Sequence, residues 1–451
     1  MSNNLKKIPI GIDNFHKLIR ENYLFCDKSL LIKEIIDEGS EVTLIVRPRR
    51  WGKTLNMSMI RHFFAPEVYG IKTKNLFDHL AIATVNNGDY LSHQGKYPVI
   101  FVSFKDVKES SFEGAFRKII QLVRILYREH RYLLQSEKLA VDEKDLFSAY
   151  LKGEIQNNDL TDSLRFLSEL LAKEHDENVY IIIDEYDTPI NAAYEKYLEK
   201  MVGFMQDLFS AALKDNSFLK QGILTGILRV SKDSILSGLN NLKTYTLLDG
   251  AYKQHFGFSE EEVTYLFEQK GCLLQLNKVK KWYNGYKAND LTIYNPWSII
   301  NCLADQGKID LYWTETAKND LVENTIGNSN ADIKSNLETL MQGGTITERI
   351  DKHVTFDILK NNETALWSLL LFTGYLKAES STFDENLGGH ICILSIPNLE
   401  VFCLYQQCMR EWLLKNLGDA ENQSDFLEDL AKRNIKQFTE RTNERATIVT
   451  R

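Results

Sequence analysis

The loop that ends in Gly52-Lys53-Thr54 contains the side chains best suited to chemistry in this chain. It follows an apolar run at residues 42–46 and opens a segment of helical character that continues from Leu55. Backbone N–H groups at the start of a helix attract anions, a lysine there reaches phosphate oxygens, and a neighbouring hydroxyl reaches Mg²⁺. The pattern therefore predicts a phosphate-binding loop between a strand and a helix.

The loop departs from the usual phosphate-loop pattern at its first position, where Arg47 replaces a glycine. Glycine normally permits a tight turn there, so either Pro48 enforces a different entry into the loop or the grip on phosphate is weaker. A chance Gly-Lys-Thr in a basic loop is the alternative interpretation. The candidate nucleotide-binding residues are Arg49, Arg50, Trp51, Gly52, Lys53, Thr54 and Leu55.

A second group of polar residues follows a predicted buried strand. Residues 179–183 are apolar apart from one tyrosine, which is typical of a strand covered on both faces. Asp184 and Glu185 come at its carboxyl end, where open parallel sheets bind their ligands. We expect Asp184 to hold Mg²⁺ together with Thr54, and Glu185 to act as general base on a water. A buried strand that ends in a solvated acidic turn is the alternative.

Two further strands are predicted at residues 97–104 and 222–226. Thr225, at the end of the latter, is placed like the polar residue that senses the γ-phosphate in ATPases with an inserted strand. Arg229 comes four residues later and is a candidate for stabilising phosphoryl charge, in its own or a neighbouring subunit. A surface salt bridge is the alternative role for Arg229. With Lys53 and Glu185, these two residues complete the candidate catalytic set.

The alternation of strands and helical stretches predicts an α/β fold with a parallel sheet flanked by helices, followed by a mainly helical region. We expect four segments along the chain. Residues 1–40 form an entry segment, and residues 41–255 form the α/β domain. Residues 256–316 form a helical lid, and residues 317–451 form a helical connector.

The composition limits the possible partners and compartments. The chain has 451 residues, of which 43% are hydrophobic and 26% charged, and its net charge is −8. Nucleic-acid binding is not indicated, because domains that bind duplexes are usually basic. Six scattered cysteines without a Cys-x-x-Cys pair favour a reducing compartment. No apolar run approaches the ~20 residues of a membrane helix, and no secretory signal is apparent. We therefore expect a cytoplasmic protein without membrane contact.

Taken together, these motifs resemble those of the bacterial AAA-ATPase-like proteins that usually carry a C-terminal PD-(D/E)XK nuclease-like domain. The resemblance spans nearly the whole chain and implies an AAA-like P-loop NTPase with ATP and Mg²⁺ as cofactors. It also implies that arginine in place of the first loop glycine is a family variant. The main matching stretches are Ile8 to Gly11, Phe25 to Ser29, Arg47 to Thr54, Ile183 to Pro189, Leu224 to Arg229, Phe256 to Ser259, Trp282 to Tyr286 and Tyr294 to Ser298.

The nuclease-like part of the family pattern is not recognisable here. Its core needs an Asp on one strand and an (Asp/Glu)-x-Lys on the next, which together bind a metal ion. Residues 428–432 have the wrong spacing for this and lie in a helical pattern. We expect the chain to stop before a nuclease-like domain, through natural truncation or gene decay.

The first functional hypothesis is ATP binding with Mg²⁺-dependent hydrolysis that moves the C-terminal helical lobe. The alternatives are a nucleotide-loaded switch or interaction module with negligible turnover, and a remnant of an ATPase–nuclease fusion. A protein partner or self-association is possible in each case. The choice between ATP and GTP is open, since no motif for base recognition is legible.

Overall fold

A computed structural model of the chain describes residues 6–155, 157–194, 196–229, 236, 238–313, 331–352, 363–386 and 388–416. The chain forms two compact units. The first comprises Met1–Phe256 with Lys352–Ile358, and the second comprises Gly257–Asp351 with Leu359–Arg451. The finer division of the chain into four segments stays a prediction.

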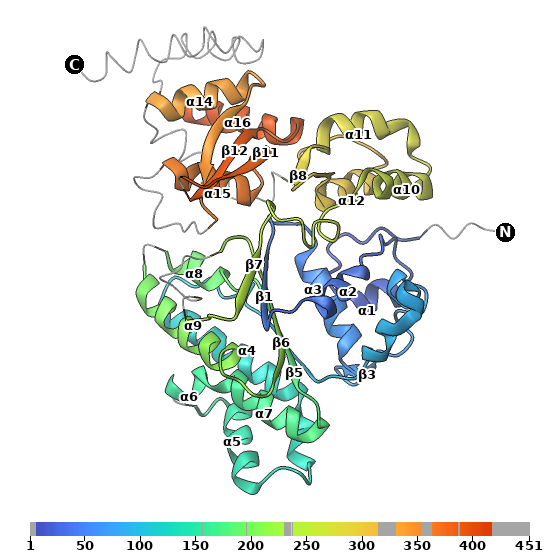
Figure 1. The fold of residues 1–451 in the computed structure, drawn as a ribbon, viewed down its shortest axis with the longest axis vertical. Helices are drawn as coiled ribbons and strands as arrows, with labels where there is room; N and C mark the ends of the chain where they lie inside the picture. The colour runs from blue at the N-terminus through green and yellow to red at the C-terminus, as the bar shows by residue number, and fades with distance from the viewer. Residues whose placement is uncertain are drawn as a thin grey trace, which may run out of the picture. The chain divides into compact units, whose positions relative to one another are not determined.

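The first unit is built around a five-stranded parallel sheet (Figure 1). Its strands are β1 (Val42–Val46), β4 (Val99–Ser103), β5 (Val179–Asp184), β6 (Leu219–Gly226) and β7 (Leu242–Tyr245). They lie in the order β4-β5-β6-β1-β7, and every neighbouring pair is parallel. The strand β6, which carries Thr225, therefore lies between β1 and β5.

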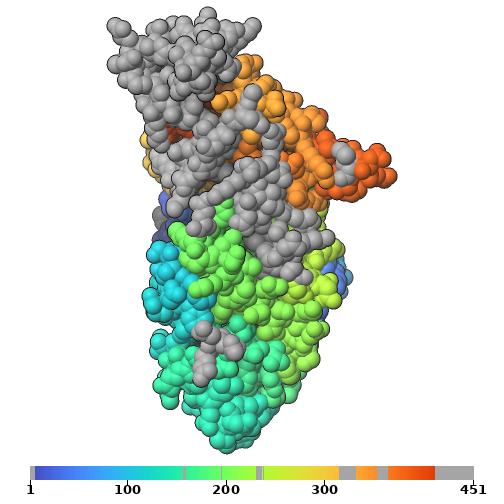
Figure 2. All heavy atoms as spheres, turned by 90° about the vertical axis from the view of Figure 1, so that its left-hand side faces the viewer, coloured from blue at the N-terminus to red at the C-terminus, as the bar shows by residue number. Residues whose placement is uncertain are grey.

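Helices lie on both sides of this sheet (Figure 1). On one side are α4 (Phe112–Glu129), α5 (Val141–Lys152), α6 (Asn157–Thr161), α7 (Ser163–His175), α8 (Thr188–Ala193) and α9 (Leu198–Leu213). Figure 2 shows the outer surface of this group in cyan to green. On the other side are α1 (Phe15–Arg20), α2 (Leu30–Asp37) and α3 (Lys53–Phe64). Shorter elements are β2 (Glu67–Val68), β3 (Ile71–Lys72), η1 (Ala81–Ala83), η2 (Val85–His93) and η3 (Arg131–Gln135).

The strand β5 is buried along its whole length, because its side chains alternate between two apolar layers. Ile181 belongs to the buried cluster that includes Leu167 of α7 and Leu208 of α9. On the opposite face, the ring of Tyr180 stacks on Phe64 of α3, with 3.9 Å between the ring centroids. Burying a large apolar side chain stabilises a fold by roughly 1.5–3 kcal/mol. These two layers therefore hold the carboxyl end of β5 in a fixed position.

The second unit combines helices with two small antiparallel sheets. Ser259 caps its first helix through a capping box with Glu262, and Asn295 caps the helix that opens with Pro296. The helices are α10 (Glu260–Lys270), η4 (Leu273–Gln275), α11 (Leu276–Tyr283), α12 (Pro296–Ala304), α14 (Ala331–Met341), α15 (Glu363–Thr373) and α16 (Leu399–Asn416). The strands are β8 (Tyr286–Ala288), β9 (Leu291–Ile293), β10 (Ile346–Ile350), β11 (Lys377–Asp384) and β12 (Gly389–Ser395).

The three-stranded sheet β10-β12-β11 is a feature that the mainly helical reading of this region did not include. The helix α15 ends at Thr373, and β11 begins at Lys377. In β12 the apolar side chains are unevenly buried, since Ile393 is 39% exposed while Cys392 and Leu394 are fully buried. Because apolar residues lie on both faces of β12, its sequence shows only a weak alternation of apolar and polar residues, which is the usual signal of a strand. The expectation that the chain stops before a nuclease-like domain rests on residues 428–432. These residues belong to the range 417–451, which lies outside the described residues.

Candidate functional site

The predicted site residues converge at the carboxyl edge of the parallel sheet in the first unit. Lys53 and Thr54 open the helix after β1, Asp184 ends β5, and Thr225 is the penultimate residue of β6. Because β6 pairs with both β1 and β5, it brings these three strand ends side by side. This edge is where open α/β sheets bind their ligands.

The loop between β1 and α3 turns through two left-handed residues. Arg50 has φ 66° and Gly52 has φ 77°, and α3 begins directly afterwards at Lys53. Left-handed backbone is easy for glycine and unusual for other residues. The loop therefore turns at Arg50 and Gly52, and not at its first position, where Arg47 replaces glycine. The first N–H groups of α3 have no acceptor within the helix, which suits them to bind an anion.

Lys53 is buried inside this loop. Its Nζ donates hydrogen bonds to the backbone oxygens of Arg47 at 3.0 Å and Pro48 at 2.8 Å. Burial lowers the pKa of its ammonium group, while the nearby carboxylates of Glu185, Asp187 and Asp184 oppose that shift. A buried cation that donates its hydrogen bonds to neutral carbonyl oxygens would form stronger, charge-assisted bonds with a phosphate group.

Asp184 is the centre of a hydroxyl network. Its Oδ2 accepts from Thr54 Oγ1 at 2.9 Å and from Ser103 Oγ at 3.3 Å, and its Oδ1 accepts from Thr225 Oγ1 at 2.7 Å. Burial raises the pKa of the carboxyl group, and the bonds from Thr225 and Thr54 act against that rise. A carboxylate beside a threonine hydroxyl is a hard oxygen donor set of the kind that Mg²⁺ prefers. The donor chemistry therefore fits a Mg²⁺ ion that is shared with phosphate.

Glu185 follows directly and has an unusual backbone conformation. Its φ of 52° lies in the left-handed region, which non-glycine residues seldom adopt outside special sites. The side chain is half-buried, and its Oε2 accepts a hydrogen bond from Thr188 Oγ1 at 3.0 Å. The hydrogen bond that Glu185 accepts therefore comes from the turn after β5 and not from the hydroxyl groups that contact Asp184.

A profile of proteins described as predicted AAA-ATPases matches residues 9–236, half of the chain. The chain belongs to the predicted AAA-ATPase family. An uncharacterized protein in the vnfD 5′ region of Azotobacter chroococcum is 27% identical over 321 residues, and the match covers 69% of this chain and 54% of that protein. The chain thus spans about half the length of this curated relative. A Walker-type ATPase from Pyrococcus abyssi matches with a TM-score of 0.43 and 12% identity, over 90% of this chain and 100% of that one.

The other predicted residues of this predicted AAA-ATPase have different surroundings. Arg49 and Arg50 are exposed on the loop, whereas the side chain of Trp51 is buried. Leu55 is half-buried in the first turn of α3. Arg229 is also half-buried and comes three residues after the end of β6. Roles for these residues in nucleotide binding or catalysis stay predictions.

Two residues of the site were missed by the sequence analysis. Ser103 lies at the end of β4, paired in register with Asp184, and a polar residue at a strand end was its only signal. Asp187 is fully buried, and its Oδ2 accepts from the backbone N–H groups of Ile227 at 2.9 Å and Leu228 at 3.2 Å. Asp187 therefore ties the turn after β5 to the loop after β6.

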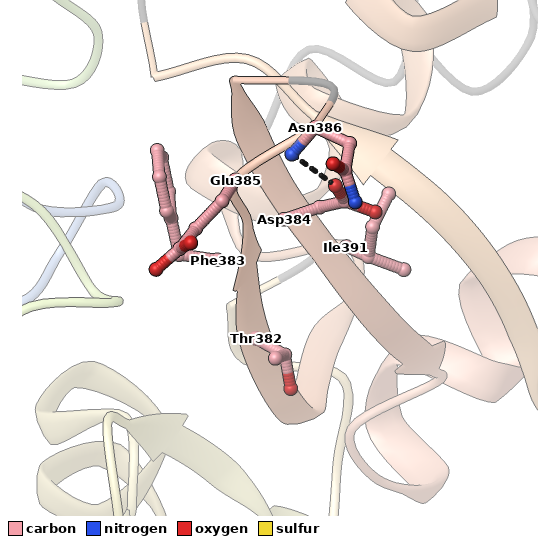
Figure 3. Close-up of a pocket in the computed structure, with 6 residues that line it drawn as sticks. All are labelled: Thr382, Phe383, Asp384, Glu385, Asn386 and Ile391. Atoms are coloured by element: carbon pink, nitrogen blue, oxygen red, sulfur yellow. Dashed lines mark hydrogen bonds between the residues drawn. The ribbon is translucent and has the colours of Figure 1, made fainter.

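The second unit has an open depression of about 510 Å³ at the turn between β11 and β12. Figure 3 shows the ring of Phe383 extending away from Asp384 and Asn386. The Asn386 N–H donates to Asp384 Oδ1 at 2.8 Å, so these polar groups stabilise the turn itself.

Within the described residues, no helix is both long and apolar enough to span a membrane, and no cluster of three His, Cys, Asp or Glu residues is placed to hold a metal.

Proposed function

We propose that this predicted AAA-ATPase binds ATP with Mg²⁺ and hydrolyses it at the carboxyl edge of its parallel sheet. The observation that carries the proposal is the contact of Thr54 and Thr225 with the same buried carboxylate, Asp184. One hydroxyl comes from the phosphate loop and the other from the inserted strand. A carboxylate that joins these two elements is suited to sense whether a metal–phosphate group is bound.

We propose a separate role in nucleotide binding or hydrolysis for each side chain of the site. Lys53 would exchange its bonds to loop carbonyls for bonds to the β- and γ-phosphate oxygens. Thr54 and Asp184 would hold Mg²⁺, which neutralises phosphate charge when bound. Glu185 would orient and deprotonate the attacking water. Thr225 and Arg229 would respond to the γ-phosphate, and Arg229 would balance charge in the transition state.

Movement of the second unit is the expected output of the cycle. The chain first passes from the first unit to the second between Phe256 and Gly257, so a change near this point would act where the two units are joined by the backbone. We propose that hydrolysis in the first unit changes the arrangement of the second. The activity of any additional domain, including a nuclease-like one, lies beyond this proposal.

A nucleotide-loaded switch with negligible turnover is the second candidate function. It is favoured by the hydrogen bond of 3.0 Å from Thr188 Oγ1 to Glu185 Oε2. A carboxylate held by a neighbouring hydroxyl is less available to a water molecule, so turnover would require its release. The switch would bind ATP firmly and release phosphate very slowly.

Phosphate release and binding of a labelled ATP analogue, both with Mg²⁺, test these functions together. Glu185→Gln should keep binding and lose turnover by about 100-fold or more, because it removes the general base. Lys53→Ala should lose binding. The matched controls are Glu137→Gln and Lys200→Ala, which change exposed side chains. Normal turnover in Glu185→Gln would show that the base is assigned wrongly, and binding without turnover in the wild type would favour the switch.

A further inference from the structure

Arg47 is the residue whose position in the phosphate loop the proposed function leaves unexplained. Its side chain is completely buried and does not extend among the loop residues that would face phosphate. The Nη1 group donates to the backbone oxygens of Val46 at 2.8 Å and Tyr245 at 3.2 Å. The guanidinium also lies 5.3 Å from the centre of the Phe256 ring, within the range of a cation–π contact.

The backbone of Arg47 joins two parts of the nucleotide site. Its N–H donates to the backbone oxygen of Gly226, at the end of β6, at 3.1 Å. Its own carbonyl oxygen accepts one of the two hydrogen bonds from Lys53 Nζ. One residue therefore contacts the inserted strand and the phosphate-loop lysine through its backbone, and the end of β7 through its side chain.

The side chain also reaches the segment of residues 246–256, which we call the bridging segment. The Nη2 group of Arg47 lies 3.5 Å from the backbone oxygen of Ala251, and Phe256 is the last residue of the segment. Gly257, the next residue, begins the second unit. The bridging segment is thus the stretch after which the chain first leaves the first unit for the second.

Helices α2 and α3 hold the bridging segment in place. Asn56 Nδ2, in the second turn from the phosphate loop, donates to His255 O at 2.8 Å. Glu34 accepts from Tyr252 N at 2.8 Å and lies 2.9 Å from His255 Nε2. The bond from Asn56 holds the segment against α3, the helix whose first turn would bind phosphate, and the bonds of Glu34 hold it against α2.

Because the Arg47 guanidinium is buried, it depends on hydrogen-bond partners within the protein. A guanidinium taken out of water needs hydrogen-bond acceptors, and here backbone oxygens accept from Nη1 and Nη2, while Nε has no hydrogen-bond partner among the described residues. The carboxylates of Asp249 and Glu34 add attraction at longer range, although burial still lowers the Arg47 pKa to about 10. A small displacement of the Arg47 backbone would therefore act on several of these contacts together.

We infer that Arg47 is a positioning residue of the nucleotide site that couples phosphate binding to the bridging segment. The inference rests on the proposed function. When Lys53 turns to phosphate oxygens, its bond to the Arg47 carbonyl is lost, and the Arg47 backbone is free to adjust. Because the side chain is bonded to β7 and the bridging segment, that adjustment is passed to the point where the second unit begins.

Hydrogen exchange followed by mass spectrometry on the full chain tests this inference. In the wild type, a non-hydrolysable ATP analogue with Mg²⁺ should change exchange of residues 246–256 by about fivefold or more, a typical coupling between two sites. Arg47→Met keeps side-chain bulk but removes the guanidinium, and it should abolish this response. Lys28→Met is the matched control, since Lys28 Nζ donates to Gln254 O at 2.7 Å. It should loosen the segment and keep the response.

The outcomes separate the inference from the proposed function. If the wild type binds the analogue and the bridging segment does not respond, the inference is wrong and nucleotide binding stands. If Arg47→Met binds the analogue and keeps the response, the inference is equally wrong. If the wild type binds no nucleotide, the proposed function and the inference both fail. Should Arg47→Met not fold, Arg47→Lys keeps the cation but loses the forked donors, and a reduced response is then expected.

Discussion

Replacing Asp187 tests whether this buried carboxylate holds the loop after β6 in place. Its Oδ2 accepts the N–H groups of Ile227 and Leu228, while its Oδ1 has no hydrogen-bond partner among the described residues. Asp187→Ala leaves the part-buried N–H group of Ile227 and the buried N–H group of Leu228 without an acceptor, and a fully buried group of this kind costs about 1–3 kcal/mol. Loss of a buried charge offsets part of this cost, so we expect a net destabilisation of about 2–4 kcal/mol.

Asp187→Asn is the informative partner of this variant. Its amide oxygen can still accept both backbone N–H groups, so the free energy of unfolding should change by only about 1 kcal/mol or less. A large gap between Ala and Asn would show that the acceptor matters more than the charge. Equal stability of the two variants would refute the assigned role of Asp187.

The pH dependence of the same pair has a definite sign. Burial raises the Asp187 pKa above the ordinary value of 3.8. Between these two pKa values the folded state holds a proton that the unfolded state has released, so this group's contribution to stability falls as pH rises. The Asn variant lacks this titration. Its stability relative to the wild type should therefore increase from about pH 4 upward and level off above the raised pKa.

Native-state hydrogen exchange of the β5 and β6 peptides is the suitable assay. A chain with two units does not guarantee a single unfolding transition, so a global melting curve would mix the two. The slowest amides of a central strand report the opening of their own unit. If the stability of Asp187→Asn relative to the wild type decreased as pH rises above about 4, the predicted pH dependence would be wrong.

Two further substitutions test the neighbouring contacts. Thr225→Val removes the hydrogen bond of 2.7 Å to Asp184, so the Asp184 pKa should rise. Turnover should fall about tenfold, and the acid limb of the pH–rate profile should move to higher pH. Gly226→Ala places a Cβ 2.6 Å from Tyr186 Cε1 and should destabilise the first unit by about 1–3 kcal/mol in hydrogen exchange. Gly203→Ala, in open space on α9, is its control and should not destabilise.

The phosphate loop and the acidic end of β5 could be predicted from the sequence, because the residues that indicate them are close together in the chain. Gly52, Lys53 and Thr54 are adjacent, and an apolar run before them predicts the strand that presents them. The same holds for Asp184 after five residues that are buried in the structure. Local order of this kind follows from side-chain periodicity and from the anion-binding property of a helix start.

The order of the strands and the partners of buried polar groups were decided only by tertiary structure. Arg47 is four residues from Trp51 in sequence, yet its side chain contacts Tyr245 and Phe256 on the far side of β1. Asp187 likewise meets Leu228 only because β6 pairs beside β5. A buried charge must find hydrogen-bond partners wherever the fold supplies them. For Arg47 these partners are backbone oxygens and for Asp187 they are backbone N–H groups, which carry no residue-type signal, so no sequence pattern could point to them.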